Sequence, residues 1–167
     1  KYYWKVVATD PSGSKTSSIM NFTVQMTPEW SYETGSNVYT VAVSADGEYI
    51  VAGGNDNKVY LFDKDNSNPL WTYTIGGDVD ALAISADGEY IVAGSDDNKV
   101  YLFDKDSSTP LWTYSTSQDV IQISISADGE YIIASCDYGN VYLFDKGSNT
   151  PLWSYDAGDY AYGADIS

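Results

Sequence analysis

Residues 85–114 read SADGEYIVAGSDDNKVYLFDKDSSTPLWTY, and this stretch decides the fold. Its valine, isoleucine, tyrosine and phenylalanine residues favour strands, and its Asp-Gly and Asp-Asn pairs favour turns. Together with the residues just before it, the stretch predicts four strands, at 79–84, 90–94, 99–104 and 111–116. The two middle strands are apolar on both faces. We therefore expect a four-stranded sheet that is covered on both sides.

The stretch is one copy of a repeat. The hexapeptide Ser-Ala-Asp-Gly-Glu-Tyr begins three times at a step of 41 residues, at Ser44, Ser85 and Ser126. A tryptophan keeps the same step, at Trp71, Trp112 and Trp153. A period of about 40 to 45 residues with four short strands per repeat is typical of the blades of a β-propeller. The sequence therefore predicts an all-β fold, an incomplete β-propeller of about three four-stranded blades.

The repeat also sets the expected boundaries. We expect a linker with an outer propeller strand at 27–37, blade 1 at 38–78, blade 2 at 79–119, blade 3 at 120–160 and the first strand of a truncated blade 4 at 161–167. Three blades cannot close a ring, because propellers have at least about four. We therefore expect an open stack, or a ring completed by sequence outside this chain. The strand around Trp30 could then supply an outer strand of the last blade.

The sequence of this repeat resembles those of two propeller families. The stretch SADGEYIVAGSDDNKVYLFD resembles a WD-repeat blade, with Leu102-Phe103-Asp104 where that family usually has Leu-Trp-Asp. The following STPLWTY resembles the tryptophan-bearing strand of quinoprotein-like (PQQ-like) repeats. WD-repeat blades use a histidine in a structural hydrogen-bond network, and this sequence has no histidine. The Asp that the family has in the turn between the second and third strands is present here as Asp56 and Asp97, but the third repeat has Tyr138 at that position. No Arg is present to bind a quinone, so we expect no cofactor.

The first 26 residues differ from the repeats. Their opening, KYYWKVVATD, resembles the strand that precedes the final hairpin of a fibronectin type III or immunoglobulin-like domain. The resemblance implies that residues 1–26 are the last two strands of such a domain. Asn21-Phe22-Thr23 matches the acceptor sequence for N-glycosylation, which makes Asn21 a candidate site in a secreted chain.

The composition excludes several classes of function. The chain carries a formal charge of −16, with eight lysines and neither arginine nor histidine. Such a surface repels nucleic acid and anionic lipid, and no apolar run is long enough to enter a membrane directly. Without histidine, no Ser-His or Cys-His nucleophile and no His-ligated metal is possible. The single cysteine, Cys136, is expected to be a buried small residue. We expect a protein that is not an enzyme.

Acidic loops offer one candidate metal site. In DKDNSN and DKDSST, alternate Asp and Ser oxygens resemble the first ligands of a calcium loop. The calcium candidates are Asp63, Asp65, Asp104 and Asp106. A full calcium loop also needs a glycine at its sixth position and a downstream glutamate, and both are missing. A solvated loop is therefore the favoured interpretation, as is a plain turn for the acidic residues around Asp56 and Asp97.

The positions where the copies differ indicate a binding surface. At the start of the first strand of each repeat, otherwise similar copies carry different residues, namely Tyr39, Thr40, Asp80, Ala81, Ile121 and Gln122. In a propeller these positions lie on one rim, where a protein or glycan partner would bind. We expect a non-catalytic scaffold or interaction module of a larger extracellular or cell-surface protein. The alternative is a quinoprotein-like enzyme or cofactor binder whose active site lies in blades outside this segment.

Overall fold

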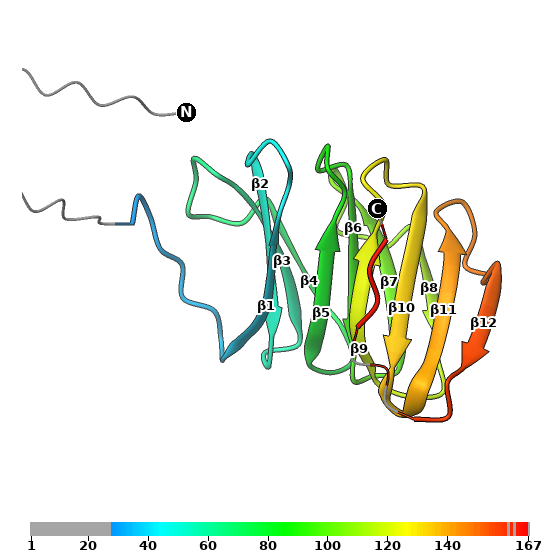
Figure 1. Ribbon diagram of the computed structural model, residues 1–167. Helices are drawn as coiled ribbons and strands as arrows, with labels where there is room; N and C mark the ends of the chain where they lie inside the picture. Colours follow the sequence, from blue (N-terminus) through cyan, green and yellow to red (C-terminus); the bar gives the residue numbers. More distant parts are fainter. Residues whose placement is uncertain (1–27, 160, 162, 167) are drawn as a thin grey trace, which may run out of the picture.

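The computed structural model describes residues 28–159, 161 and 163–166. These residues form three separate antiparallel sheets of four strands each (Figure 1). The strands of the first sheet are β1 (Val38–Val43), β2 (Tyr49–Gly54), β3 (Lys58–Asp63) and β4 (Trp71–Thr74). Those of the second are β5 (Val79–Ile84), β6 (Tyr90–Ser95), β7 (Lys99–Asp104) and β8 (Trp112–Ser115). Those of the third are β9 (Val120–Ile125), β10 (Tyr131–Cys136), β11 (Asn140–Asp145) and β12 (Trp153–Asp156), with the short 3-10 helix η1 (Asp137–Gly139) between β10 and β11.

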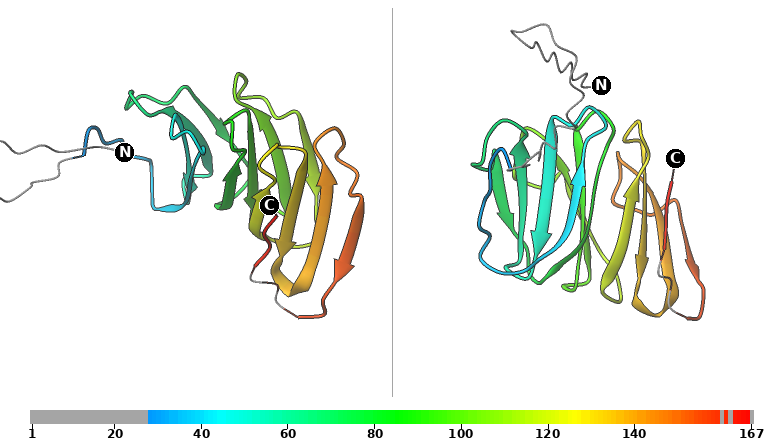
Figure 2. Two further views of the ribbon diagram at one scale, coloured as in Figure 1. Left: turned by 45° about the horizontal axis from the view of Figure 1, so that its top comes forward. Right: turned by 60° about the vertical axis from the view of Figure 1, so that its left-hand side comes forward.

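Each sheet is a meander whose strands pair in chain order, and the three sheets stand side by side like blades (Figure 2). The first strands β1, β5 and β9 follow one another along the inner side, where they contact each other across the blade boundaries. The predicted all-β, incomplete propeller is thereby confirmed. The strands predicted at 79–84 and 99–104 have these bounds in the structure. The fourth strand is one residue shorter than predicted at each end, although the Leu111 and Thr116 amides still donate to the carbonyl oxygens of Leu102 and Asn98.

The repeated hexapeptide forms the turn between the first two strands of each blade. In blade 1 the Ser44 hydroxyl donates to Asp46 Oδ1 at 2.6 Å, and the same oxygen accepts the Glu48 amide at 3.0 Å. Gly47 takes the left-handed conformation that the turn needs, with φ of 76°. The hydrogen bonds to Asp46 lower the pKa of its carboxyl group. Blades 2 and 3 repeat this arrangement, so the acidic residue of the motif has a structural role.

A tryptophan joins each blade to the next. The Trp71 indole lies in the outer strand of blade 1 and donates to the carbonyl oxygen of Lys105 in blade 2 at 2.7 Å. Its ring lies 5.4 Å from that of Phe103. Trp112 contacts Lys146 and Phe144 of blade 3 in the same way. The tryptophan that recurs every 41 residues thus packs across the seam between one blade and the next.

Two further segments extend the stack at its ends. Trp30 donates to the carbonyl oxygen of Lys64 at 2.6 Å and packs on Phe62, as Trp71 does on the next blade. Near the other end, the Ser124 hydroxyl donates to Asp165 Oδ1 at 3.0 Å. No strand is assigned within 28–37 or 163–166, although both segments lie where the repeat predicts an outer and a first strand. Within the described residues, no helix has the length and apolar character needed to cross a membrane.

Candidate functional site

A β-bulge lies at the start of the first strand in every blade. The ladder between β1 and β2 passes from Val38 to Thr40 and leaves out Tyr39. Asp80 is left out in the same way in blade 2, and Ile121 in blade 3. A bulge turns the side chain of the extra residue out of the regular alternation, and bulges are frequent beside binding sites. The three bulged residues therefore differ from the rest of the repeat in backbone geometry, and they also differ from one another in side-chain type.

The bulged residues lie at one end of the stack, because all three first strands begin there. The turns between the second and third strands end at the same edge, and so do the linkers between blades. Backbone hydrogen bonds tie linker to turn: the Asp96 amide donates to the carbonyl oxygen of Asp78 and the Asp137 amide to that of Asp119. We call this edge the bulge rim, defined by Tyr39, Asp80 and Ile121 with the linker and turn residues around them.

Carboxylates crowd around Asp80 on the bulge rim. Burial is the largest influence on Asp80 and raises the pKa of its carboxyl group to about 6. Repulsion by four neighbouring carboxylates adds to this increase, those of Asp96, Asp78, Asp119 and Asp137. Burial also raises the pKa of Asp96. The seam between blades 2 and 3 thus concentrates negative charge, and of these five residues only Asp80 was named as a rim residue from the sequence.

The other predicted rim residues have different surroundings. Thr40 is half-buried and Gln122 is exposed, both next to a bulged residue. Ala81 is only 5% exposed, because its methyl group packs in the core cluster shared by blades 2 and 3. The prediction that Ala81 contributes to a binding surface is therefore wrong. Tyr39, by contrast, is 51% exposed and free to meet a partner.

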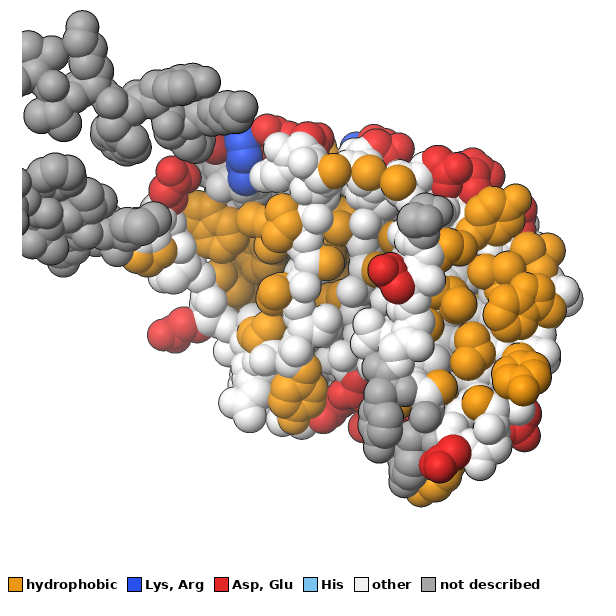
Figure 3. Space-filling model, in the orientation of Figure 1, with side chains coloured by type: hydrophobic (Ala, Val, Ile, Leu, Met, Phe, Trp, Pro, Cys, Tyr) orange, Lys and Arg blue, Asp and Glu red, His pale blue; other side chains and the backbone are white. Residues whose placement is uncertain are grey.

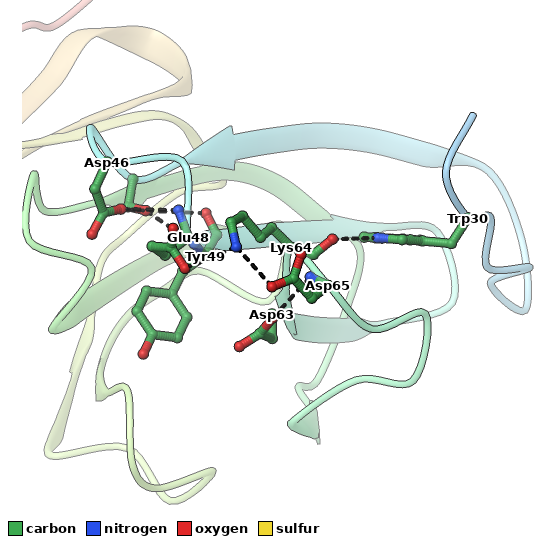
Figure 4. A network of polar contacts seen from close by, with 8 residues as sticks. Trp30, Asp46, Glu48, Tyr49, Asp63, Lys64 and Asp65 are labelled. Atoms are coloured by element: carbon green, nitrogen blue, oxygen red, sulfur yellow. Dashed lines mark hydrogen bonds and ion pairs between the residues drawn. The ribbon is translucent and has the colours of Figure 1, made fainter. Parts of the chain in front are cut away.

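The candidate calcium ligands are already engaged in local contacts (Figure 4). Asp63 Oδ1 accepts the Asp65 amide at 2.8 Å, and Lys64 Nζ lies 2.7 Å from Asp65 Oδ2 and 3.2 Å from Glu48 Oε2. Asp104, Lys105 and Asp106 repeat the pattern in blade 2. In the part of the chain that the structure describes, no three acidic or cysteine side chains converge to form a metal site. These loops are turns in which a lysine forms ion pairs with the neighbouring carboxylates.

The turn aspartate of the WD-repeat pattern holds a structural network. Asp97 Oδ2 accepts the Tyr101 hydroxyl at 2.5 Å and the Gly76 amide at 3.1 Å, so it links the blade to its preceding linker. Asp56 makes the same contacts with Tyr60 and Gly35. The neighbouring Asn57 and Asn98 have φ of 62° and 63°. The prediction of a plain turn at these positions is confirmed.

Two other positions were considered from the sequence, Cys136 and Asn21. Cys136 is fully buried, and burial raises the pKa of its thiol to about 11. Such a thiol is protonated at neutral pH and is a poor nucleophile. Asn21 lies outside the described residues, as does the whole predicted hairpin of residues 1–26.

The carboxylates around Asp80 escaped the sequence analysis for a physical reason. Asp96 belongs to the same blade as Asp80, whereas Asp78 and Asp119 lie in the linkers before and after that blade and Asp137 comes from blade 3. The four are brought together by the packing of one blade on another, which no local pattern encodes. A usable signal was the concentration of acidic residues in linkers and turns that the propeller topology places at one end.

Comparison with known proteins places this geometry in a family. The family model described as outer membrane protein assembly factor BamB (PQQ_2) matches residues 5–166. The chain therefore belongs to this family of PQQ-like propellers. The match includes most of the segment for which a fibronectin-like hairpin was predicted, and that finer assignment stays a prediction.

A solved structure supports the same fold. A chain in the crystal structure of the mitotic checkpoint complex superposes with a TM-score of 0.71 at 20% sequence identity. The superposition covers 81% of this chain and 44% of that one, so the present chain spans less than half of its length. At this identity the similarity shows a WD-repeat-like propeller fold and nothing about function. No curated protein matches the sequence.

Proposed function

Since the chain belongs to the BamB-like propeller family, we propose that it is a non-catalytic interaction module that binds a polypeptide partner through the bulge rim. The observation that carries the proposal is the bulge at Tyr39, Asp80 and Ile121. Three blades of nearly identical sequence present an aromatic ring, a carboxylate and an aliphatic side chain at one structural position. If these positions served only to hold the blades together, the three repeats would not need three different kinds of side chain at the bulge.

The electrostatics of the rim favour a partner with lysine or arginine side chains. The charged form of Asp80 is disfavoured both by burial and by the carboxylates around it. A cationic side chain placed among these groups would relieve that repulsion, and the exposed ring of Tyr39 would add an apolar contact at the other end of the rim. We therefore infer a basic polypeptide segment that lies across the first strands.

The lack of histidine and arginine in the sequence supports a role other than catalysis. The family takes its description from an assembly factor for outer membrane proteins, a role that depends on association with other proteins. We further propose that the chain belongs to a larger extracellular or cell-surface protein, with residues 1–26 as the end of a fibronectin-like domain. The predicted acceptor site at Asn21 fits that location. Protease digestion of intact source cells tests it, because a module facing the cytoplasm would be protected.

Titration with a lysine-rich synthetic peptide tests binding at the rim. Isothermal titration calorimetry should show binding that weakens as salt rises, because the attraction is electrostatic. Asp80→Asn should weaken it about fivefold to tenfold, and Tyr39→Ala by a smaller factor. Asp106→Asn is the matched control, since it removes the same charge from an exposed loop outside the rim.

The control separates a site from general attraction to an acidic protein. If Asp80→Asn and Asp106→Asn weaken peptide binding equally, the net charge of the chain explains the binding and the rim does not. Quinone absorbance or redox activity in the purified protein would instead favour an enzyme of the quinoprotein class.

A further inference from the structure

The turn between the second and third strands of blade 3 departs from the repeat. Blades 1 and 2 have Asp56 and Asp97 in this turn, and blade 3 has Tyr138 at the same position. The side chain of Asp97 is only 9% exposed, since it points inward and accepts the Tyr101 hydroxyl. Tyr138, by contrast, is 59% exposed. One position of the repeat therefore faces inward in blade 2 and outward in blade 3.

A change in backbone conformation accompanies the exposed tyrosine. In blades 1 and 2 the left-handed residue of the turn is an asparagine, Asn57 or Asn98. In blade 3 the left-handed conformation extends over Tyr138 and Gly139, with φ of 62° and 93°. A side chain as large as tyrosine rarely adopts this conformation, because its Cβ atom crowds the main-chain carbonyl oxygen. Backbone strain of this kind is concentrated at functional sites, and here it accompanies an outward-facing ring.

The outward position of Tyr138 is a property of the turn itself. In blade 2 the turn is closed by the Thr116 amide, which follows the fourth strand and donates to the carbonyl oxygen of Asn98 at 2.8 Å. In blade 3 the Ala157 amide donates to the carbonyl oxygen of Gly139 in the same way, at 2.9 Å. The two turns are held alike against the chain that follows them, so the exposure of Tyr138 comes from its own conformation.

Other residues of blade 3 replace the structural role of the missing aspartate. In blade 2 Asp97 also accepts the amide of Gly76, which lies in the linker before the blade. Blade 3 has Ser117 at that linker position, and the Ser117 side chain is hydrogen-bonded to the hydroxyl group of Tyr142 in the third strand. The third-strand tyrosine therefore keeps a partner without an aspartate in the turn. The fold of blade 3 does not require Tyr138 for this contact.

Blade 3 also lacks the lysine that lies beside this turn in blade 2. Lys99 Nζ is 3.6 Å from Asp97 Oδ2. Asn140 stands at the lysine position in blade 3, and its side-chain amide donates to Gln118 Oε1 at 2.7 Å. The turn of blade 3 thus contains the carboxylate of Asp137 and no lysine.

The turn of blade 3 lies beside the carboxylates that surround Asp80. The Asp137 amide donates to the carbonyl oxygen of Asp119 at 3.0 Å, and both residues are among those that repel the ionised form of Asp80. In Figure 3, acidic side chains lie at the lower edge of the molecule, where Figure 1 shows β5 to begin. An exposed aromatic ring beside carboxylates suits a cation, because the ring face attracts positive charge and the carboxylates accept hydrogen bonds from it.

We propose that Tyr138 is a specificity-determining residue of the bulge rim, and that its ring receives a lysine or arginine side chain of the bound polypeptide. This inference rests on the proposed function, which puts a basic segment on the rim. In blade 2 the chain supplies its own cation, Lys99, beside the turn. In blade 3 the partner supplies it. The ring accepts apolar side chains as well, and the carboxylates beside it add the preference for a positive one.

Two substitutions separate binding from folding. Tyr138→Asn removes the ring and introduces a residue that tolerates the left-handed conformation. It should raise the melting temperature by about 1 to 4 °C, because strain is relieved. It should also weaken binding of the lysine-rich peptide about fivefold, since the ring is lost. Tyr138→Phe keeps the ring and should bind within about twofold of the wild type.

Isothermal titration calorimetry and thermal melts followed by circular dichroism supply the two measurements. Tyr131→Asn is the matched control, since Tyr131 is a tyrosine that is 43% exposed at the opposite end of β10 from the turn. Its replacement should leave the affinity for the peptide unchanged. A peptide with arginine in place of lysine should depend on Tyr138 at least as strongly, because a guanidinium group stacks on an aromatic ring.

The outcomes distinguish this inference from the proposed function. If the wild type binds neither peptide, both are wrong. If Asp80→Asn weakens binding and Tyr138→Asn does not, the rim binds the peptide and Tyr138 has no part in it. A lower melting temperature for Tyr138→Asn would also overturn the inference, because the ring would then serve the fold. Weaker binding by a variant at least as stable as the wild type is the result that supports it.

Discussion

Blades 2 and 3 have similar sequences, yet they differ in how much of each is buried. Leu102 and Val100 in blade 2 are fully buried, whereas the equivalent Leu143 and Val141 in blade 3 are only half-buried. Blade 2 has a full blade on each side, while after blade 3 only residues 161 and 163–166 are described. The comparison teaches that the environment of a residue in this fold is set by the neighbouring blade as much as by its own repeat.

The largest difference is expected from truncating the buried leucines. Leu102→Ala should lower the free energy of unfolding by about 3 kcal/mol, because it leaves a cavity in a closed blade. Leu143→Ala should cost about half of that, since part of its side chain already meets water. Urea denaturation followed by circular dichroism measures both. Equal losses would show that blade 3 is as fully covered as blade 2.

The next contrast concerns the tyrosines of the third strands. Tyr101→Phe removes the hydroxyl group that donates to Asp97 and should cost about 1.5 to 2 kcal/mol, because the acceptor is a buried carboxylate. Blade 3 has Tyr138 where blade 2 has Asp97. Tyr142→Phe should therefore cost less than about 1 kcal/mol in the same urea experiment. A larger loss for Tyr142→Phe would contradict the structural role given to Asp97.

A smaller effect is expected from the joint tryptophans. Trp112→Phe keeps an aromatic ring but leaves the carbonyl oxygen of Lys146 without its indole donor, at a cost of about 1 kcal/mol. Trp153→Phe should change stability by only about a few tenths of a kcal/mol, because the Trp153 side chain is 46% exposed. A full cost at Trp153 would contradict the exposure of its side chain in the structure.

The smallest effects are expected from pH. Because the pKa of Asp80 is raised to about 6 in the folded chain, ionisation costs more in the folded than in the unfolded state. Stability should therefore fall as pH rises from about 4 to about 6, by on the order of 1 kcal/mol after solvent screening. Asp80→Asn should remove that fall. Thermal melts across this pH range would contradict the prediction if the variant and the wild type change in parallel.

The turn carboxylates should give the opposite dependence of stability on pH, and they serve as a control. Hydrogen bonds from Ser85 and Glu89 lower the pKa of Asp87, so its contribution is present above about pH 4 and is lost as pH falls through the lowered value. Asp87→Asn should therefore destabilise the chain at neutral pH, and the difference should disappear in acid. Asp80 and Asp87 lie in the same repeat, so the difference between the two variants reports the different surroundings of the two carboxyl groups.

Much of the fold was predictable because it is local and repeated. The strands at 79–84 and 99–104, the turn at Asp87 and the joint made by Trp112 each follow from residue types at fixed spacing. The blade was therefore identified correctly from one stretch of sequence. The family match and the superposed propeller agree with it.

The rim was only partly predictable. Comparison of the copies pointed to Tyr39, Asp80 and Ile121, but it could not show that each is the extra residue of a bulge. It also included Ala81, since a buried position can vary as freely as an exposed one when its neighbours adjust. The crowding of Asp80 depends on Asp119, in the linker after its blade, and on Asp137, in blade 3, and these groups come close to Asp80 only after packing.

The tryptophan joint has a consequence for how such a chain can grow in evolution. The indole donates to a main-chain carbonyl oxygen, a group that every residue carries whatever its side chain. A duplicated 41-residue unit therefore arrives with a donor for the unit after it and an acceptor for the unit before it. Mutations in the side chains of each copy then leave this connection intact. Gene duplication can lengthen this protein one blade at a time, and each new rim position is free to acquire its own specificity.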